Sequence, residues 1–203
     1  MAIWLKTFPI HEESPAHYTK DLSLSLGGCH AAPEEFFRRT QRFTNVKKLT
    51  VSGTQGLQPV WIPSFGRLPE SVTSLTIDTD IATLLEIRDL MVQLPNLSDL
   101  TLSGSLHGMD EDRLRGIGTV LRGEFGGQLR LPRLRRNADP HVINMLLEIP
   151  TGVHFTEVYI ACVYDCLPST VELTEACGKN LVKLTYSVDD YSKFYFSPPG
   201  SRP

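Results

Sequence analysis

Three cysteines in the C-terminal part of the chain, Cys162, Cys166 and Cys177, are the first residues whose type and spacing could do chemistry. Thiolates bind zinc and act as nucleophiles, and Cys29 followed by His30 could complete a set of ligands. Structural zinc sites favour two residues between paired cysteines, whereas three separate Cys162 from Cys166. We therefore expect buried or incidental thiols, no bound metal and no other cofactor.

The histidines and acids form no recognisable catalytic motif. No two histidines have the i, i+4 spacing around a carboxylate that a zinc-protease helix uses. The histidines are His11, His17, His30, His107, His141 and His154. A Cys–His pair meets only in space, so a small cytosolic Cys/His-dependent enzyme stays open as an alternative. The acids Asp110, Glu111 and Asp112 could act in acid–base catalysis. They lie at a predicted helix start, however, where the helix dipole stabilises negative charge, and this explains them without a catalytic role. We predict no catalytic residue and no enzyme.

Arginine is concentrated between residues 113 and 136, with Glu124 as the single acid after the first of them. The seven arginines are Arg113, Arg115, Arg122, Arg130, Arg133, Arg135 and Arg136. A solvated edge explains such a run, and a docking patch for an acidic or phosphorylated partner is the sharper interpretation, because guanidinium groups grip such oxygens bidentately. The predicted basic patch consists of Arg122, Arg133, Arg135 and Arg136. Nucleic acid is not expected, since only Phe125 is interleaved as a stacking residue.

The bulk composition is that of an ordinary folded protein. The chain has 203 residues, a formal charge of −3, 41% hydrophobic residues and 21% charged residues. No apolar run approaches the roughly 18 residues that cross a bilayer, so no membrane partner is expected. The N-terminus lacks a secretory pattern, and four cysteines are too sparse for a disulfide scaffold. We therefore expect reduced thiols, a cytoplasmic or nuclear location and a monomer.

The elements that must position these residues follow a repeat. The segments FTNVKKLTVSG (43–53), LPESVTSLTID (68–78) and LPNLSDLTLSG (94–104) share one skeleton. We call its central apolar residue the anchor; each anchor lies in a short alternating run, which is typical of a strand. The predicted anchors are Leu24, Leu49, Leu75, Leu100, Leu129, Val158 and Leu184, at intervals of 25, 26, 25, 29, 29 and 26 residues.

Four helices are predicted between the strands. The first begins at Pro33, the second is capped by Asp80, and the third is capped by Asp139. The fourth begins at Ser169 or the next residue and ends at Gly178. The apolar faces of the second and third helices are Leu84, Ile87, Met91 and Leu94, and Val142, Met145, Leu146 and Ile149.

This pattern resembles the leucine-rich repeat family, L-x-x-L-x-L-x-x-N/C, over residues 18–190. Five of the seven positions that lie five residues after an anchor hold small hydrogen-bonding residues or cysteine. These seven are Cys29, Thr54, Asp80, Ser105, Leu134, Val163 and Asp189. The whole is similar to the repeat region of F-box/leucine-rich-repeat proteins of mushroom-forming fungi, without an F-box-like module at the N-terminus.

The resemblance implies an α/β leucine-rich-repeat solenoid of about seven degenerate strand–helix units with a parallel concave sheet. Residues 1–17 would form an N-terminal extension and residues 191–203 a C-terminal tail. The function implied is non-catalytic protein binding, with substrate recognition for an F-box-type ubiquitin ligase if another part or chain supplies the F-box. A truncated relative with no autonomous function is a further alternative.

Side chains that flank an anchor point away from the core, because strand side chains alternate. They predict the partner-binding face, and the partner is a protein of unknown identity. The predicted residues are Lys48, Thr50, Thr76, Asp78, Asp99, Thr101, Gln128, Arg130, Glu157, Tyr159, Lys183 and Thr185. Within this set the C-terminal half is favoured, because Tyr and Arg most often anchor interfaces.

Overall fold

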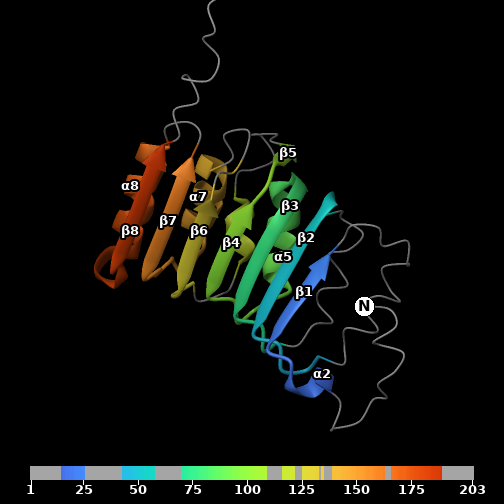
Figure 1. Cartoon of the computed structure of the whole chain (residues 1–203). Helices are drawn as coiled ribbons and strands as arrows, with labels where there is room; N and C mark the ends of the chain where they lie inside the picture. The colour runs from blue at the N-terminus through green and yellow to red at the C-terminus, as the bar shows by residue number, and fades with distance from the viewer. Residues whose placement is uncertain are drawn as a thin grey trace, which may run out of the picture.

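The fold is α/β and is built on one parallel sheet. The computed structural model describes residues 15–25, 43–57, 70–108, 116–121, 125–132, 134, 139–162 and 166–188, with backbone only at 54–57, 82 and 107–108. Seven strands pair side by side in chain order, all parallel, and β5 pairs with β3 beyond the end of β4 (Figure 1). The strands are β1 Asp21–Ser25, β2 Lys48–Leu57, β3 Ser74–Thr83, β4 Asp99–Ser103, β5 Leu106–Gly108, β6 Gln128–Pro132, β7 Glu157–Cys162 and β8 Lys183–Val188. The predicted order and direction of the strands are confirmed.

Six of the seven predicted anchors lie side by side across the sheet. The register pairs run in sequence from Leu49 through Leu75, Leu100, Leu129 and Val158 to Leu184. Their side chains and those two residues later form the core between the sheet and the helices. All of these core residues are buried from β2 to β7. Each unit therefore buries the apolar residues of its strand against those of the next unit, which explains the repeat in the sequence.

The predicted anchor Leu24 is wrong by two residues. Leu22 is the partner of Leu49, and Leu24 is the partner of Val51. Both leucines are buried, so the alternation of the strand is the same for either register. The change also removes Cys29, which lies outside the described residues, from the position five residues after the anchor.

A hydrogen bond that recurs before β2 and β4 agrees with the corrected register. Asn45 Nδ2 donates to the carbonyl oxygen of His17 at 2.7 Å, and Asn96 Nδ2 donates to that of Glu70 at 2.7 Å. Each asparagine lies four residues before its anchor and reaches a carbonyl that lies five residues before the anchor of the preceding unit. His17 has this position only if Leu22 is the first anchor.

The described helices, except the first and shortest one at the end where β1 begins, lie behind the sheet in the view of Figure 1. They are α2 Pro15–Tyr18, α5 Leu84–Val92, α7 Asp139–Leu147 and α8 Leu167–Cys177, with 3-10 turns η2 Ile117–Val120 and η3 Gly178–Asn180. The apolar faces predicted for α5 and α7 are buried. The helix predicted at Pro33 lies outside the described residues, and the predicted domain boundary after residue 17 falls inside α2.

Two predicted helix starts are wrong. Strand β3 continues to Thr83, which caps α5, and the Glu86 carboxylate accepts a hydrogen bond from the Thr83 backbone N–H at 3.1 Å. Asp80 instead accepts a hydrogen bond from the Ser105 backbone N–H at 3.2 Å, where the strand bends away. Helix α8 begins at Leu167, earlier than predicted, because a proline fits its first turn. Its predicted end at Gly178, which has φ of 54°, is confirmed.

Candidate functional site

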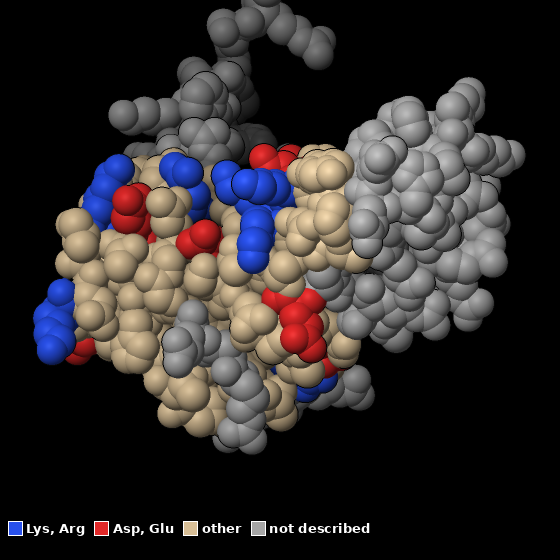
Figure 2. Space-filling view, turned by 90° about the horizontal axis from the view of Figure 1, so that it is seen from below, with Lys and Arg blue, Asp and Glu red and all other residues tan. Residues whose placement is uncertain are grey.

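All twelve residues of the predicted partner-binding face lie on the sheet face opposite the helices, which we call the open face. Each is exposed or half-buried, while its neighbours along the strand are buried in β2 to β7. Seen from the end where the strands begin, positive and negative side chains on the surface are interspersed rather than segregated by sign (Figure 2). The alternation of side chains between the two faces of a strand already explains why these residues lie on the open face. Their role in binding therefore stays a prediction.

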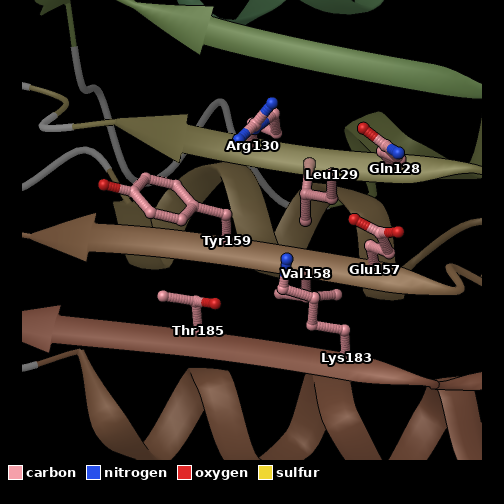
Figure 3. A pocket seen from close by; sticks show the side chains of 8 residues that line it. All are labelled: Gln128, Leu129, Arg130, Glu157, Val158, Tyr159, Lys183 and Thr185. Carbon is pink, nitrogen blue, oxygen red and sulfur yellow. The ribbon is translucent and has the colours of Figure 1, made fainter.

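The three C-terminal strands arrange their open-face residues as two rows. Gln128, Glu157 and Lys183 are register partners in one row. Arg130, Tyr159 and Thr185 form the second row, two residues further along. Together with Leu129 and Val158 they surround a shallow hollow of about 30 Å³ (Figure 3). That volume accommodates one or two water molecules.

The guanidinium of Arg130 lies over the ring of Tyr159. The distance from Arg130 Cζ to the ring centroid is 5.6 Å, within the range of a cation–π contact. The contact crosses from β6 to β7 and holds two long side chains against the sheet. It therefore presents a planar cation and a phenol hydroxyl together at one side of the hollow (Figure 3).

Four polar side chains around the hollow have no hydrogen bond and no ion pair to another described residue: Gln128, Arg130, Glu157 and Lys183. On β3 and β4 the open-face acids are already used. Asp78 Oδ1 accepts a hydrogen bond from Ser103 Oγ at 2.8 Å, and Asp99 accepts one from the backbone of β6. Charged side chains without a hydrogen bond or ion pair to another described residue thus occur on β6, β7 and β8, and also at the other end of the open face, where Asp21 and Lys48 are register partners.

Asp99 has a structural role that the sequence analysis missed. At most junctions a single carbonyl oxygen before a strand accepts two N–H groups from the next unit. These carbonyls belong to Lys20, Lys47, Thr73, Gly127 and Thr156. Between β4 and β6, Ser98 O accepts only Gly127 N, and Gln128 N donates to Asp99 Oδ1 at 2.7 Å. Asp99 therefore completes a backbone ladder and is not a free acceptor on the open face.

The predicted basic patch cannot be placed beside this surface. Arg122, Arg133, Arg135 and Arg136 lie outside the described residues, as do Asp110, Glu111 and Asp112. Of the seven arginines between residues 113 and 136, Arg130 is the one that the structure describes.

The cysteine thiols of the described part are buried and unpaired. Cys162 Sγ donates to Tyr186 Oη at 3.7 Å and to the carbonyl oxygen of Ser187 at 3.6 Å. Burial, with a contribution from Cys162, raises the pKa of Cys166 to about 12, and burial also raises the pKa of Cys177. Thiols with such pKa values are poor nucleophiles and poor metal ligands at neutral pH.

The remaining candidates for chemistry do not converge within the residues that the structure describes. No group of three or more His, Cys, Asp or Glu side chains there could hold a metal ion. His17 Nδ1 lies 3.3 Å from Thr44 Oγ1, His141 is on α7, and His154 is exposed just before β7. Cys29, His11 and His30 and the side chain of His107 fall outside the described part.

Asp139 is a buried acid whose environment the sequence did not reveal. Its side chain is 1% exposed, and its Oδ1 atom has no hydrogen-bond partner among the described residues. Burial raises the pKa of this carboxyl group to about 7, against the lowering effect of its own backbone N–H. Asp139 is predicted to cap α7, but it is the first residue of the helix, and it lies in the core close enough to Cys166 to raise the thiol pKa as well.

Comparison with known proteins gives no match to this chain, whether with family models, curated proteins or solved structures. Among the described helices, the longest of which has 11 residues, none has the length and apolar character needed to cross a membrane. The fold and the open face must therefore be interpreted from their own geometry.

Proposed function

We propose that the chain is a leucine-rich-repeat solenoid that binds a protein partner on its open face, over β6, β7 and β8. The observation that carries the proposal is the Arg130–Tyr159 contact beside three polar side chains that have no hydrogen bond or ion pair with another described residue. Tyr and Arg are the residues that most often dominate binding energy at interfaces. A regular array of strands with matched registers supports the solenoid, in which such a face would be concave.

The binding mechanism is recognition on a preformed sheet, without a bond made or broken. A carboxylate of the partner would fit between Arg130 and Lys183, which lie on opposite sides of β7. Glu157 would accept from a donor of the same partner, because it has no ion pair with the described cations. Because the strands hold these side chains in register, little ordering is required on binding.

A catalytic function has weaker support. The hollow of about 30 Å³ is far smaller than the clefts of roughly 300–1,000 Å³ that enclose small-molecule substrates. The buried thiols of high pKa also argue against a cysteine nucleophile in the described part. Protein binding therefore remains the better conclusion.

The experiment that tests the proposal is affinity capture from a cell extract, with the wild type beside an Arg130→Glu/Tyr159→Ala double variant. Both residues project from the sheet, so the variant is expected to fold. A Lys48→Glu/Thr76→Ala variant makes a similar change at the other end of the open face and serves as the matched control. We expect the first variant to lose partners that the control retains. Identical partner sets from all three proteins would refute a site on β6 to β8.

The resemblance to F-box proteins further suggests that the partner is a substrate for ubiquitylation, recognised in the cytoplasm or nucleus. In that case the same capture would contain ubiquitin-ligase subunits together with the partner. Partners recovered reproducibly without any ligase subunit would exclude this role and leave the binding function intact.

A further inference from the structure

The second row of the hollow consists of hydrogen-bond donors. Arg130 contributes a guanidinium, and Tyr159 and Thr185 contribute hydroxyl groups that form no hydrogen bond with another described residue. Lys183 belongs to the first row, but its side chain extends toward β7 and lines the same hollow (Figure 3). The second row contains no acid of its own. It therefore suits an anion, because carboxylate oxygens form their strongest hydrogen bonds with charged donors.

The first row places an acceptor two residues away from these donors. Glu157 is half-buried on β7, and the Gln128 amide is its neighbour on β6. No ion pair joins Glu157 to Lys183, its register partner on β8, or to another described cation. Two residues of a strand span roughly 6.6 Å. A ligand that matches both rows must therefore carry a negative and a positive group at about this separation.

The spacing of the strands limits the shape of such a ligand. Arg130 and Lys183 project from β6 and β8, which lie on either side of β7 and are roughly 9.6 Å apart. A helix with its side chains is about 10–12 Å wide and would not enter between these two long side chains. An extended chain would enter, since neighbouring extended chains pack at roughly 4.8 Å. Its side chains at positions i and i+2 point the same way and have the same separation as the two rows.

We propose that the hollow recognises an extended segment of a protein partner that carries an acidic residue and, two residues away, a lysine or arginine. The inference rests on the proposed function and adds the conformation and the charge pattern of the bound segment. The segment lies along β7. Its carboxylate accepts from Arg130 and the Tyr159 hydroxyl, with Lys183 on its other side, and its cation pairs with Glu157. Either order of the two charges fits, because the segment can run in either direction along the strand.

The other end of the open face has charges but lacks this arrangement. Asp21 and Lys48 are register partners, so their opposite charges lie in one row on neighbouring strands. The residues two positions further along are Ser23 and Thr50, which carry no charge. A segment with its charges two residues apart therefore finds no matching pair of rows there. Lys48 can serve as a control for the lysine of the hollow.

The test uses the full chain and two synthetic peptides of identical composition. In the first peptide a central glutamate is flanked by threonines, and a lysine follows each threonine, two residues from the glutamate. In the second peptide each lysine has exchanged places with its threonine, so that the net charge is the same but the charges are adjacent. Threonine favours the extended conformation. Fluorescence anisotropy is expected to show at least about tenfold tighter binding of the first peptide.

Substitutions in the chain identify the residues that make the contacts. Arg130→Gln and Lys183→Gln should each weaken binding of the first peptide about tenfold, whereas Lys48→Gln should leave it unchanged. Glu157→Lys should abolish the preference for the first peptide. The same variant should instead prefer a third peptide, in which both lysines are replaced by glutamates. This exchange of preference distinguishes a direct contact from a loss of folding, because an unfolded chain would prefer neither peptide.

Two results would overturn the proposal. Equal affinity for the first and second peptides, or binding of neither at about 1 mM, would mean that the spacing of the charges is not recognised. No preference of Glu157→Lys for the third peptide would mean that Glu157 does not meet the cation. If the peptides fail while the capture experiment still separates the Arg130→Glu/Tyr159→Ala variant from its control, the open face binds a partner of other chemistry. Failure of both experiments would also refute the proposed function.

Discussion

Asp99 Oδ1 accepts a hydrogen bond from the backbone N–H of Gln128 at 2.7 Å, and it occupies the space that a side chain at residue 127 would need. A Cβ atom at Gly127 would lie 1.8 Å from this oxygen. The Asp99 carboxylate therefore fits in this position only because residue 127 has no side chain. Together the glycine and the carboxylate join β4 to β6 at the one principal junction where a carbonyl oxygen does not bridge two N–H groups.

Removal of the Asp99 carboxylate is expected to weaken this junction. Asp99→Ala should lower the free energy of unfolding by about 1–2 kcal/mol, because a backbone donor loses its acceptor. Gly127→Ala should cost more in the wild type than in the Asp99→Ala background, since the collision at 1.8 Å is then gone. Urea unfolding of the four proteins measures both effects. The control is Gly126→Ala, where a Cβ meets nothing within 4 Å; additive costs would contradict the dependence.

Gly104 permits the close approach of β4 to the backbone of β3. Its φ is +114°, and a Cβ there would lie 2.3 Å from the Thr79 carbonyl oxygen. Gly104→Ala should therefore lower the free energy of unfolding by more than about 2 kcal/mol, as strain and collision add. Gly116→Ala separates the two causes, because Gly116 has φ of +73° with open space around it, and should cost only about 1 kcal/mol. Equal losses for the two variants would mean that the collision relaxes freely.

The buried carboxyl of Asp139 predicts a pH dependence of stability. Its pKa is about 7 in the folded chain against 3.8 for an exposed aspartate, so the folded state holds the proton between these pH values while the unfolded state releases it. The free energy of unfolding should therefore fall as pH rises from 4 to 7 and level off above 7. Asp139→Asn removes this dependence, and its advantage over the wild type should reach about 4 kcal/mol at pH 8, since each pKa unit corresponds to ~1.4 kcal/mol.

Denaturant unfolding at several pH values checks the Asp139 prediction. Glu157→Gln, a change of a partly exposed carboxylate on the open face, is the matched control and should follow the wild-type curve. Parallel curves for the wild type and Asp139→Asn would show that Asp139 finds a partner in solution.

The thiol of Cys166 is expected to be inert in the native protein. Burial raises its pKa to about 12, so almost no thiolate exists at pH 8. Alkylation at Cys166, followed by peptide mass spectrometry, should be at least ~10-fold slower in the native than in the denatured protein. A cysteine at the exposed position 187, in Ser187→Cys, should react quickly in both states. Rapid native labelling of Cys166 would revive the case for a reactive cysteine.

The Arg130–Tyr159 contact should be measurable without any partner. Arg130→Gln and Tyr159→Leu, alone and combined, should give a coupling energy of about 0.5–1 kcal/mol in the free energy of unfolding. The control cycle pairs Arg130→Gln with Thr101→Ala, since Thr101 is the neighbour of Arg130 on the other side and no hydrogen bond joins their side chains. Coupling of equal size in both cycles would mean that Arg130 acts through the strand and not through the ring.

The order of the strands and the composition of the open face could be predicted from the sequence, because burial imposes both the period of the repeat and the alternation within each strand. The register of β1 against β2 could not be predicted, since Leu22 and Leu24 satisfy the alternation equally well. The end of β3 could not either. Its extension to Thr83 depends on pairing with β5, a contact between segments about 25 residues apart.

The chemistry of the acids was also beyond sequence reasoning. From the local sequence alone, all three acids are plausible helix caps or surface residues: Asp80, Asp99 and Asp139. The structure gives them three different roles: an acceptor at a strand bend, an acceptor in a backbone ladder, and a buried carboxyl group with a raised pKa in the core. Each role depends on a neighbour from another unit, or on the core that the units build together, and the pattern of one unit does not encode it.

Among the seven strands that pair in chain order, the β4–β6 pairing is the shortest, with two register pairs, whereas the β6–β7 and β7–β8 pairings have five and six. If the two ends of the chain were pulled apart, the sheet would therefore be expected to separate first between β4 and β6. The piece that survives on the C-terminal side would keep Arg130, Tyr159 and Lys183 together. Stretching would then separate strands β1 to β4 from the rest of the sheet and leave the proposed binding residues in their places on β6, β7 and β8.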